Sequence, residues 1–190
     1  MKSLTEIPGV WFRELATFAD DRGAFTETFR QEWLPAGDPP VIQSNLSRSK
    51  AGVLRGMHFH RSQTDWWVVL EGSAFVALCD LRAGSPVRGT VVTDTLDAAA
   101  GLTALSIPPG VAHGFCALSD VALQYMVTAY HDGSDENGFA WDDPDAAIAW
   151  PVAQPILSER DRTNPSLSEA LRDLAGGPSP GPLPGEDPPV

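Results

Sequence analysis

The chain has 190 residues and a formal net charge of −12, from 13 lysines and arginines against 25 aspartates and glutamates. This length predicts one domain with a single core, and a hydrophobic content of 43% excludes a disordered chain. The acidic balance excludes non-specific binding to nucleic acid or to an anionic membrane, although a few arginines suffice for a small anion. The only lysines are Lys2 and Lys50, so no lysine is available beyond residue 50.

The N-terminus lacks the apolar segment of a secretory signal peptide. No stretch approaches the roughly 18 apolar residues of a membrane-spanning helix. We therefore expect a cytoplasmic protein that does not contact membranes. Cys79 and Cys116 each lie in an apolar, strand-like run, which predicts two buried free thiols.

Short apolar runs separated by Gly, Ser and Asp predict a mainly β protein. In chain order, strands are expected at residues 9–18, 23–29, 66–70, 74–79, 87–93, 103–107, 114–117 and 123–130. A hairpin turn is expected at 71–73 and a second turn at 82–86. Many short strands at a spacing of about ten residues are typical of a sandwich, a jelly roll or a barrel.

One helix is expected, at residues 167–174, because its leucines share one face and because Ser166 and Glu169 form a capping box at its start. After two glycines the composition changes abruptly, and residues 178–190 are rich in proline. This segment predicts a disordered tail without a packing role. The expected organisation is therefore one domain over residues 1–177, followed by the tail.

Three of the four histidines lie in two short segments. His58 and His60 alternate in a strand, so they share one face. Arg55 falls on the opposite face of a regular strand, but Gly56 can supply a bulge that re-aims it. His113 follows a proline-glycine turn and begins a strand. In a small barrel, strands that face inward would bring the three histidines into one cavity.

These two segments resemble the motifs of the cupin superfamily. The first motif is Gly, five residues, His-x-His, three or four residues, Glu, six residues and Gly; residues 52–72 match it, with Asp65 at the acidic position. The second, Pro-x-Gly-x-x-His, is matched by residues 108–113. The resemblance implies a cupin jelly-roll barrel, here with an N-terminal strand extension and a short C-terminal helix. His131 matches neither motif and is expected on the surface.

Six ordered segments within residues 5–165 resemble the nucleotide-diphospho-sugar 3,5-epimerases of the dTDP-4-dehydrorhamnose 3,5-epimerase type. They are residues 21–27, 43–49, 52–58, 108–115, 141–145 and 156–162. The resemblance implies an isomerase that inverts carbon 3, carbon 5 or both of a dTDP-4-keto-6-deoxyhexose in deoxysugar biosynthesis, without a metal or a nicotinamide cofactor. A 4-keto group acidifies the hydrogens on the neighbouring carbons, so that one base and one acid can perform the inversion.

The same resemblance implies the catalytic residues. His58 corresponds to the base, Asp161 to the aspartate that orients it, and Tyr125 to the acid. An aspartate that holds one ring nitrogen fixes the tautomer and raises the basicity of the other nitrogen. His113 would help to hold the sugar or the dyad, and Tyr130 is a candidate for contacts with thymine or sugar. For Tyr125, an aromatic side chain packed in the core is the alternative.

The nucleotide-binding residues also follow from the resemblance. Arg22 and Arg55 correspond to arginines that bind the pyrophosphate, a role that suits bidentate guanidinium contacts. The residues that correspond to contacts with the base, the sugar or the phosphates are Phe25, Glu27, Gln43 and Asn45. Family dimers commonly lend Arg22, Phe25 and Glu27 from the partner subunit, so the resemblance implies a homodimer.

The chain departs from the family at two positions. His60 stands where the family has Gln, and Asp65 stands where it has a lysine that stabilises the enolate oxygen. An ionised carboxylate about 4 Å from a developing enolate repels it by about 4 kcal/mol. One explanation is that Asp65 is protonated, or paired with His60 or Arg61. Others are that His60 or His113 replaces the lysine as donor, or that substrate and reaction differ.

Two other functions stay open. His58, His60, Asp65 and His113 are near the three-histidine, one-carboxylate set of metal-binding cupins. Such a set suits Fe, Mn, Ni or Zn and predicts a metal-dependent cupin isomerase or dioxygenase. Asp161 argues against it, since its expected role is to orient His58 as a base. The other alternative is a non-catalytic sugar-nucleotide-binding protein that keeps the fold.

Overall fold

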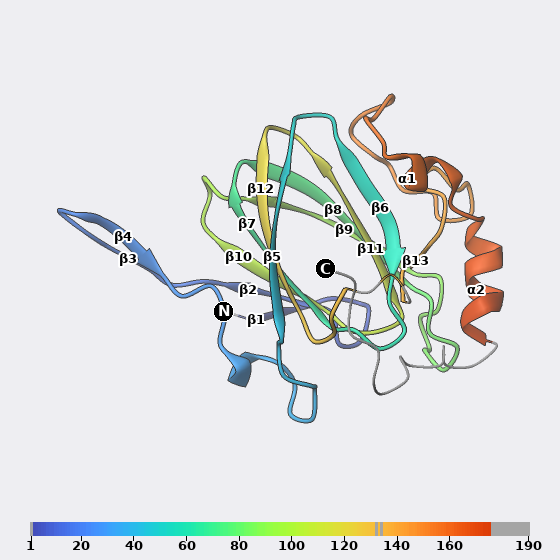
Figure 1. Ribbon diagram of the computed structural model, residues 1–190, viewed down its shortest axis with the longest axis horizontal. Coiled ribbons are helices and arrows are strands. Elements are labelled where there is room, and N and C mark those ends of the chain that lie inside the picture. The colour runs from blue at the N-terminus through green and yellow to red at the C-terminus, as the bar shows by residue number, and fades with distance from the viewer. Residues whose placement is uncertain (1, 132, 134, 176–190) are drawn as a thin grey trace.

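The computed structural model describes residues 2–131, 133 and 135–175. Two antiparallel sheets pack face to face, and a two-stranded hairpin projects from one end (Figure 1). The prediction of a mainly β jelly roll with an N-terminal strand extension and a short C-terminal helix is confirmed. The predicted tail at 178–190 lies outside the described residues, and the domain boundary at residue 177 stays a prediction.

The two sheets take the following strands in spatial order. The six-stranded sheet consists of β1 (Lys2–Leu4), β2 (Trp11–Glu14), β10 (Thr103–Ile107), β7 (Asp65–Glu71), β12 (Val121–Val127) and β5 (Gln43–Ser49). The five-stranded sheet consists of β13 (Asn137–Gly138), β6 (Leu54–Phe59), β11 (Val111–Ala117), β8 (Ser73–Asp80) and β9 (Val91–Asp97). The other elements are β3 (Thr17–Asp20), β4 (Gly23–Thr26), the 3-10 turn η1 (Gln31–Trp33), α1 (Glu159–Thr163) and α2 (Leu167–Ala175).

The core has one layer between the sheets and one layer outside each of them. On β7, Trp67 joins the cluster between the sheets, whereas Trp66 joins the cluster on the outer face of the six-stranded sheet. Both faces of this central strand are therefore covered, which explains its uninterrupted apolar sequence. The third cluster lies behind the five-stranded sheet, where Phe59 and Phe139 pack beside α2. Burial of these large side chains on folding supplies the main stabilising free energy.

Helix α2 begins with the predicted capping box. The backbone N–H of Ser166 donates to the Glu169 carboxylate at 2.8 Å, and the N–H of Glu169 donates to the Ser166 hydroxyl at 3.3 Å. Leu167 is buried, and Leu171 and Leu174 pack against the same cluster. The predicted helix and its apolar face are thus confirmed. The five-residue helix α1 has no apolar repeat and was not predicted.

The turn at 71–73 is not a hairpin, contrary to the prediction. Strand β7 pairs with β10 and β12, whereas β8 pairs with β11 and β9, so this turn joins the two sheets. Both edges of β7 are already paired, and the chain has to cross to the other sheet. Gly72 makes the corner with a φ of +79°, and a Cβ on it would lie 2.0 Å from the Asp120 carbonyl oxygen.

The loop at the turn predicted at 82–86 is longer than expected. The strand expected at 87–93 therefore begins only at residue 91. Asp80 explains the longer loop. Its buried carboxylate accepts hydrogen bonds from Arg82 and Ser85, and the backbone carbonyl of Asp80 accepts one from Gly89. Burial raises the pKa of Asp80, but the bonds from Arg82 and Ser85 outweigh it and hold that pKa below the ordinary value.

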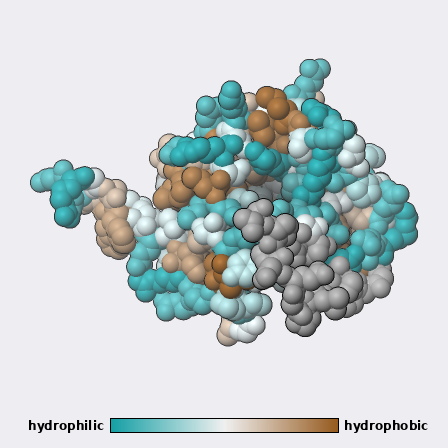
Figure 2. Space-filling view, viewed as in Figure 1, coloured by the Kyte–Doolittle hydropathy of each residue, from teal (hydrophilic) through white to brown (hydrophobic). Residues whose placement is uncertain are grey.

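The strand expected at 9–18 divides into β2 and β3. The break lies at Leu15, whose N–H donates to the Leu102 carbonyl at 2.9 Å and whose side chain is buried. Strands β3 and β4 form an arm that projects from the barrel, with apolar side chains along it and a polar tip (Figure 2). Phe18 and Phe25 on this arm are 65% and 63% exposed.

Cys79 and Cys116 are buried free thiols, as predicted. Burial raises the pKa of Cys79 to about 12, so this thiol is unreactive at neutral pH. Across the described ranges, the longest and most apolar helix falls short of what is needed to cross a bilayer.

Candidate active site

A cavity of about 270 Å³ lies between the two sheets. Six of the predicted site residues line it, together with His60 and Asp65: Gln43, Asn45, Arg55, His58, His113 and Tyr125. Both walls contribute, because β5 and β12 belong to one sheet and β6 and β11 to the other. The prediction that inward-facing strands bring three histidines into one cavity is confirmed.

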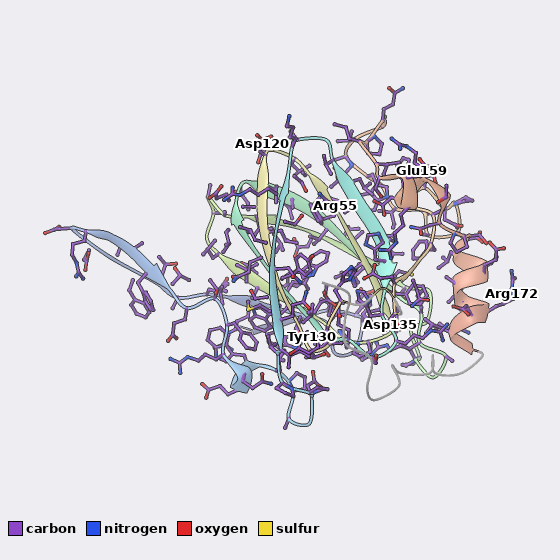
Figure 3. All side chains as sticks on the ribbon, viewed as in Figure 1. Arg55, Asp120, Tyr130, Asp135, Glu159 and Arg172 are labelled. Carbon is purple, nitrogen blue, oxygen red and sulfur yellow. The ribbon has the colours of Figure 1, made fainter. Side chains whose placement is uncertain are left out.

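Arg55 reaches the cavity through an irregularity in β6. His58 is opposite His113 and Arg55 is opposite Phe115, so three steps along β6 match two steps along β11. The extra residue is a bulge that reverses the facing of Arg55, as predicted. Gly56 occupies it with a φ of +134°. Figure 3 labels Arg55 between the sheets, where its Nε donates to the Ser49 hydroxyl at 3.0 Å.

His58 forms a dyad with Asp161. Its Nε2 lies 2.6 Å from Asp161 Oδ1, and the Ser158 hydroxyl donates to the other carboxylate oxygen at 2.7 Å. Burial raises the pKa of Asp161, but the bonds from His58 and Ser158 outweigh it and keep that pKa below the ordinary value. The carboxylate therefore favours the tautomer of the neutral His58 ring that carries its proton on Nε2, which leaves Nδ1 as the nitrogen available to a substrate.

Tyr125 lies on the other wall of the cavity. It belongs to β12, where it is opposite Asn45 of β5 and Trp67 of β7. Burial raises its pKa, and the nearby carboxylates of Asp65 and Glu136 raise it further. Its phenol therefore stays protonated and can donate a proton from the wall that faces His58.

His60, Asp65 and His113 form a second group in the same cavity. One ring nitrogen of each histidine and one carboxylate oxygen of Asp65 all lie within 4.8 Å of one another. The Gln63 amide donates to Asp65 at 3.0 Å. Burial raises the pKa of Asp65, whereas burial lowers the pKa of His113 well below its ordinary value, with His60 and His58 contributing. Arg61, the other partner considered for Asp65, binds Asp173 at 2.5 Å.

Three ionisable lining residues were not predicted as site residues: His131, Glu136 and Arg160. Glu136 is paired with the Arg160 guanidinium and with His131, whose Nδ1 lies 2.9 Å away. Burial raises the pKa of Glu136, but Arg160 and His60 outweigh it and lower the pKa overall. His131 is exposed, as expected, yet it also lines the cavity. These residues follow no periodic pattern, and only Arg160 lies in a segment matched by resemblance.

Four predicted site residues lie away from the cavity of this chain. Arg22 and Phe25 belong to the β3–β4 arm, where the Arg22 guanidinium pairs with Asp20. Glu27 follows the arm and pairs with Arg30 at 2.7 Å. Tyr130 is 69% exposed and does not line the cavity; Figure 3 labels it near the lower edge of the barrel.

The sequence is similar to known epimerases over most of its length. Residues 4–169 match the family model described as dTDP-4-dehydrorhamnose 3,5-epimerase. A dTDP-4-dehydrorhamnose 3,5-epimerase of Pseudomonas aeruginosa is 39% identical over 171 residues, covering 86% of this chain and 94% of that protein. One from Neisseria gonorrhoeae is 37% identical over 172 residues; the match covers 87% of this chain but 52% of that longer protein.

Solved structures show the same relationship. NovW, a 4-keto-6-deoxy sugar epimerase from the novobiocin gene cluster of Streptomyces spheroides, has a TM-score of 0.83 at 34% identity, covering 95% of this chain and 93% of its own. ChmJ, a 3'-monoepimerase from Streptomyces bikiniensis determined with dTDP-quinovose, has a TM-score of 0.83 at 33% identity, covering 92% and 91%. The similarity therefore extends through the barrel and its cavity.

Proposed function

The chain belongs to the dTDP-4-dehydrorhamnose 3,5-epimerase family, and on this premise we propose that its cavity inverts carbon 3, carbon 5 or both of a dTDP-4-keto-6-deoxyhexose. It is an isomerase of the dTDP-sugar epimerase class, which acts in deoxysugar biosynthesis. The observation that supports the reaction best is the placement of His58 and Tyr125 on opposite sheets that wall one cavity. Inversion requires a proton to leave one face of a carbon and another to arrive on the opposite face.

His58 is the proposed base. Its Nδ1 removes the proton from carbon 3 or carbon 5, and the electron pair of the broken C–H bond forms an enolate with the 4-keto group. Asp161 stabilises the imidazolium that results, because its buried carboxylate already accepts from Nε2. Tyr125 then donates its proton to the opposite face of the carbon, which restores the ketone. Solvent returns a proton to Tyr125 and removes one from His58.

The proposed nucleotide contacts lie beside this pair. Arg55 enters the cavity from β6 and offers a guanidinium for the pyrophosphate. Gln43 and Asn45 share a face of β5, where the Gln43 amide donates to Asn45 at 2.9 Å. Their polar groups are placed to contact the sugar or the phosphates. The positive charge of Arg55 in the cavity explains how a chain with a net negative charge can bind an anionic substrate.

Incubation with dTDP-4-keto-6-deoxyglucose in D2O tests this function. We expect NMR to show deuterium at carbon 3, carbon 5 or both, because every proton returned to carbon comes from a group that exchanges with solvent. Label at both carbons defines a 3,5-epimerase, and label at one defines a mono-epimerase. A reaction without enzyme corrects for spontaneous enolisation, and enzyme-dependent label at neither carbon would refute the proposal for this substrate.

A homodimer in which the β3–β4 arm reaches the partner's cavity is also proposed. The arm projects from the barrel and carries two exposed phenylalanines, Phe18 and Phe25. Exposed apolar surface of this kind is typical of a protein interface. Arg22 and Glu27, which the resemblance assigns to the substrate, are paired within the arm region rather than placed at their own cavity. The cytoplasmic location expected from the sequence stays a prediction.

The double variant Phe18→Asp, Phe25→Asp is expected to be monomeric in sedimentation velocity and to bind dTDP at least about tenfold more weakly. Two charges in the apolar interface would oppose association, and the partner's arm residues would then be missing from the cavity. Leu118→Asp, which adds one charge at an exposed turn, is the control and should sediment as a dimer. A dimeric double variant with unchanged dTDP affinity would contradict the exchange of arms.

A further inference from the structure

Three electron-pair donors converge inside the cavity. His60 follows β6, Asp65 begins β7 and His113 lies on β11, so the barrel brings them together from both sheets. One ring nitrogen of each histidine and one oxygen of the carboxylate all lie within 4.8 Å of one another. The two imidazole rings are tilted by 37° with centroids 5.5 Å apart, so they do not stack in parallel.

The hydrogen bonds of the two histidines define which nitrogens are available. Nδ1 of His60 lies 2.7 Å from the Asp135 carbonyl oxygen, and Nδ1 of His113 lies 3.2 Å from the Val111 carbonyl oxygen. A carbonyl oxygen only accepts hydrogen bonds, so each Nδ1 carries the proton. In the neutral form of each ring, Nε2 is then the nitrogen with the lone pair. Histidines that bind metal ions have this arrangement, in which one nitrogen is fixed by a carbonyl or carboxylate and the other is the ligand.

Hydrogen bonds also fix the carboxylate of Asp65. Only 3% of the residue is exposed, and its two carboxylate oxygens accept from Gln63 Nε2 at 3.0 Å and Trp67 Nε1 at 3.4 Å. Two imidazole lone pairs and a buried carboxylate repel one another unless a positive charge lies between them. A shared proton can bridge two of the three donors, whereas a metal ion uses all three at once.

We propose that His60, Asp65 and His113 bind one divalent transition-metal ion in this cavity. Two imidazole nitrogens and one carboxylate oxygen suit Zn²⁺, Fe²⁺, Co²⁺ or Ni²⁺, and three protein ligands leave positions open toward the cavity for water or substrate. His58 is not part of the set, because its Nε2 is committed to Asp161. The site thus differs from the four-residue set that the sequence suggested.

The role of this ion rests on the proposed epimerase function. His60, Asp65 and His113 would hold the ion in the cavity that also contains His58 and Tyr125, where it would supply Lewis-acid stabilisation to an enolate oxygen. The negative charge of Asp65, which alone would repel the enolate, then serves to hold the cation. This accounts for a carboxylate at the position where the resemblance leads one to expect a lysine.

Titration of the metal-stripped full-length protein with Co²⁺ tests the site without any substrate. We expect one Co²⁺ per chain, with the visible ligand-field absorption of a nitrogen- and oxygen-ligated ion. His60→Ala and Asp65→Asn should each weaken binding by at least about 30-fold. His131→Gln and His58→Gln, which remove histidines of the same cavity that lie outside the cluster, should bind Co²⁺ as the wild type does. Thermal melting of each variant without metal verifies its fold.

Absence of stoichiometric Co²⁺ binding by the wild-type protein would overturn the site. Equal affinity in the wild type and in folded His60→Ala or Asp65→Asn would also overturn it. Failure of these titrations leaves the deuterium exchange test of the epimerase untouched, so the two proposals fail independently. If the site binds but the stripped protein exchanges deuterium at the full rate in the presence of a chelator, the catalytic role of the ion is overturned.

Discussion

The variant His58→Gln is expected to lose at least about 1,000-fold of the deuterium-exchange rate while its affinity for dTDP stays within about threefold. A general base contributes on this scale, and 1,000-fold corresponds to about 4 kcal/mol of transition-state stabilisation. Glutamine is the better replacement because its amide nitrogen reaches the position of the histidine Nε2 and can still donate to Asp161, which is buried. Alanine would leave that carboxylate without one of its donors and risks a loss of stability unrelated to catalysis.

Exchange is measured by NMR in D2O, dTDP binding by calorimetry, and folding by thermal melting. The companion variant Asp161→Asn separates orientation from proton transfer. It should lower kcat by about 100-fold with little change in KM, because His58 would lose the carboxylate that fixes its tautomer and stabilises its charged form. If His58→Gln weakened dTDP binding as much as it slowed exchange, His58 would be a structural residue rather than the base.

The barrel was predictable from the sequence because strand periodicity and turn residues are local signals. The runs at 66–70 and 103–107 fall on β7 and β10 with boundaries within one residue. The turn at 71–73 shows the limit of such signals. A glycine with positive φ suits a hairpin and a corner between sheets equally well. Only the pairing of β7 with strands from distant segments decides between them.

The site was predictable where it lies on strands. Alternation placed His58 and His60 on one face, and Gly56 indicated the bulge that turns Arg55 inward. The Asp161 partner of His58 lies 103 positions along the chain on the short helix α1, and it was assigned by resemblance alone. Glu136 follows β12 in a segment without periodicity, so no local pattern connected it with the cavity.

The departure at Asp65 was visible in the sequence, but its consequence depends on neighbours that the sequence does not place. The structure sets two histidine nitrogens beside this carboxylate and fixes the tautomers of both rings through backbone carbonyls. Those carbonyls belong to Asp135, which lies outside every motif, and to Val111, which occupies a variable position of the second motif. Backbone groups are common to every residue, so their part in a site emerges only from the fold.

The variant Gly56→Ala is expected to destabilise the protein by about 3 kcal/mol and to weaken dTDP binding in whatever protein still folds. Two costs combine. A φ of +134° is nearly restricted to glycine, and such backbone strain costs about 1–3 kcal/mol in another residue. In addition, a Cβ on Gly56 would lie 2.6 Å from the Gly114 Cα, so β6 and β11 would have to separate where they carry His58 and His113.

Two other glycines separate these costs. Gly52 has a φ of +82°, and a methyl group on its Cα would meet nothing within 4 Å, so Gly52→Ala should show the backbone cost alone, about 1 kcal/mol. Gly84 has open space and no positive φ, so Gly84→Ala should change the free energy of unfolding by less than about 0.5 kcal/mol. Denaturant unfolding measures all three. Equal stability of Gly56→Ala and Gly52→Ala would show that β6 and β11 tolerate a methyl group, and the close approach at the bulge would then not constrain the catalytic wall.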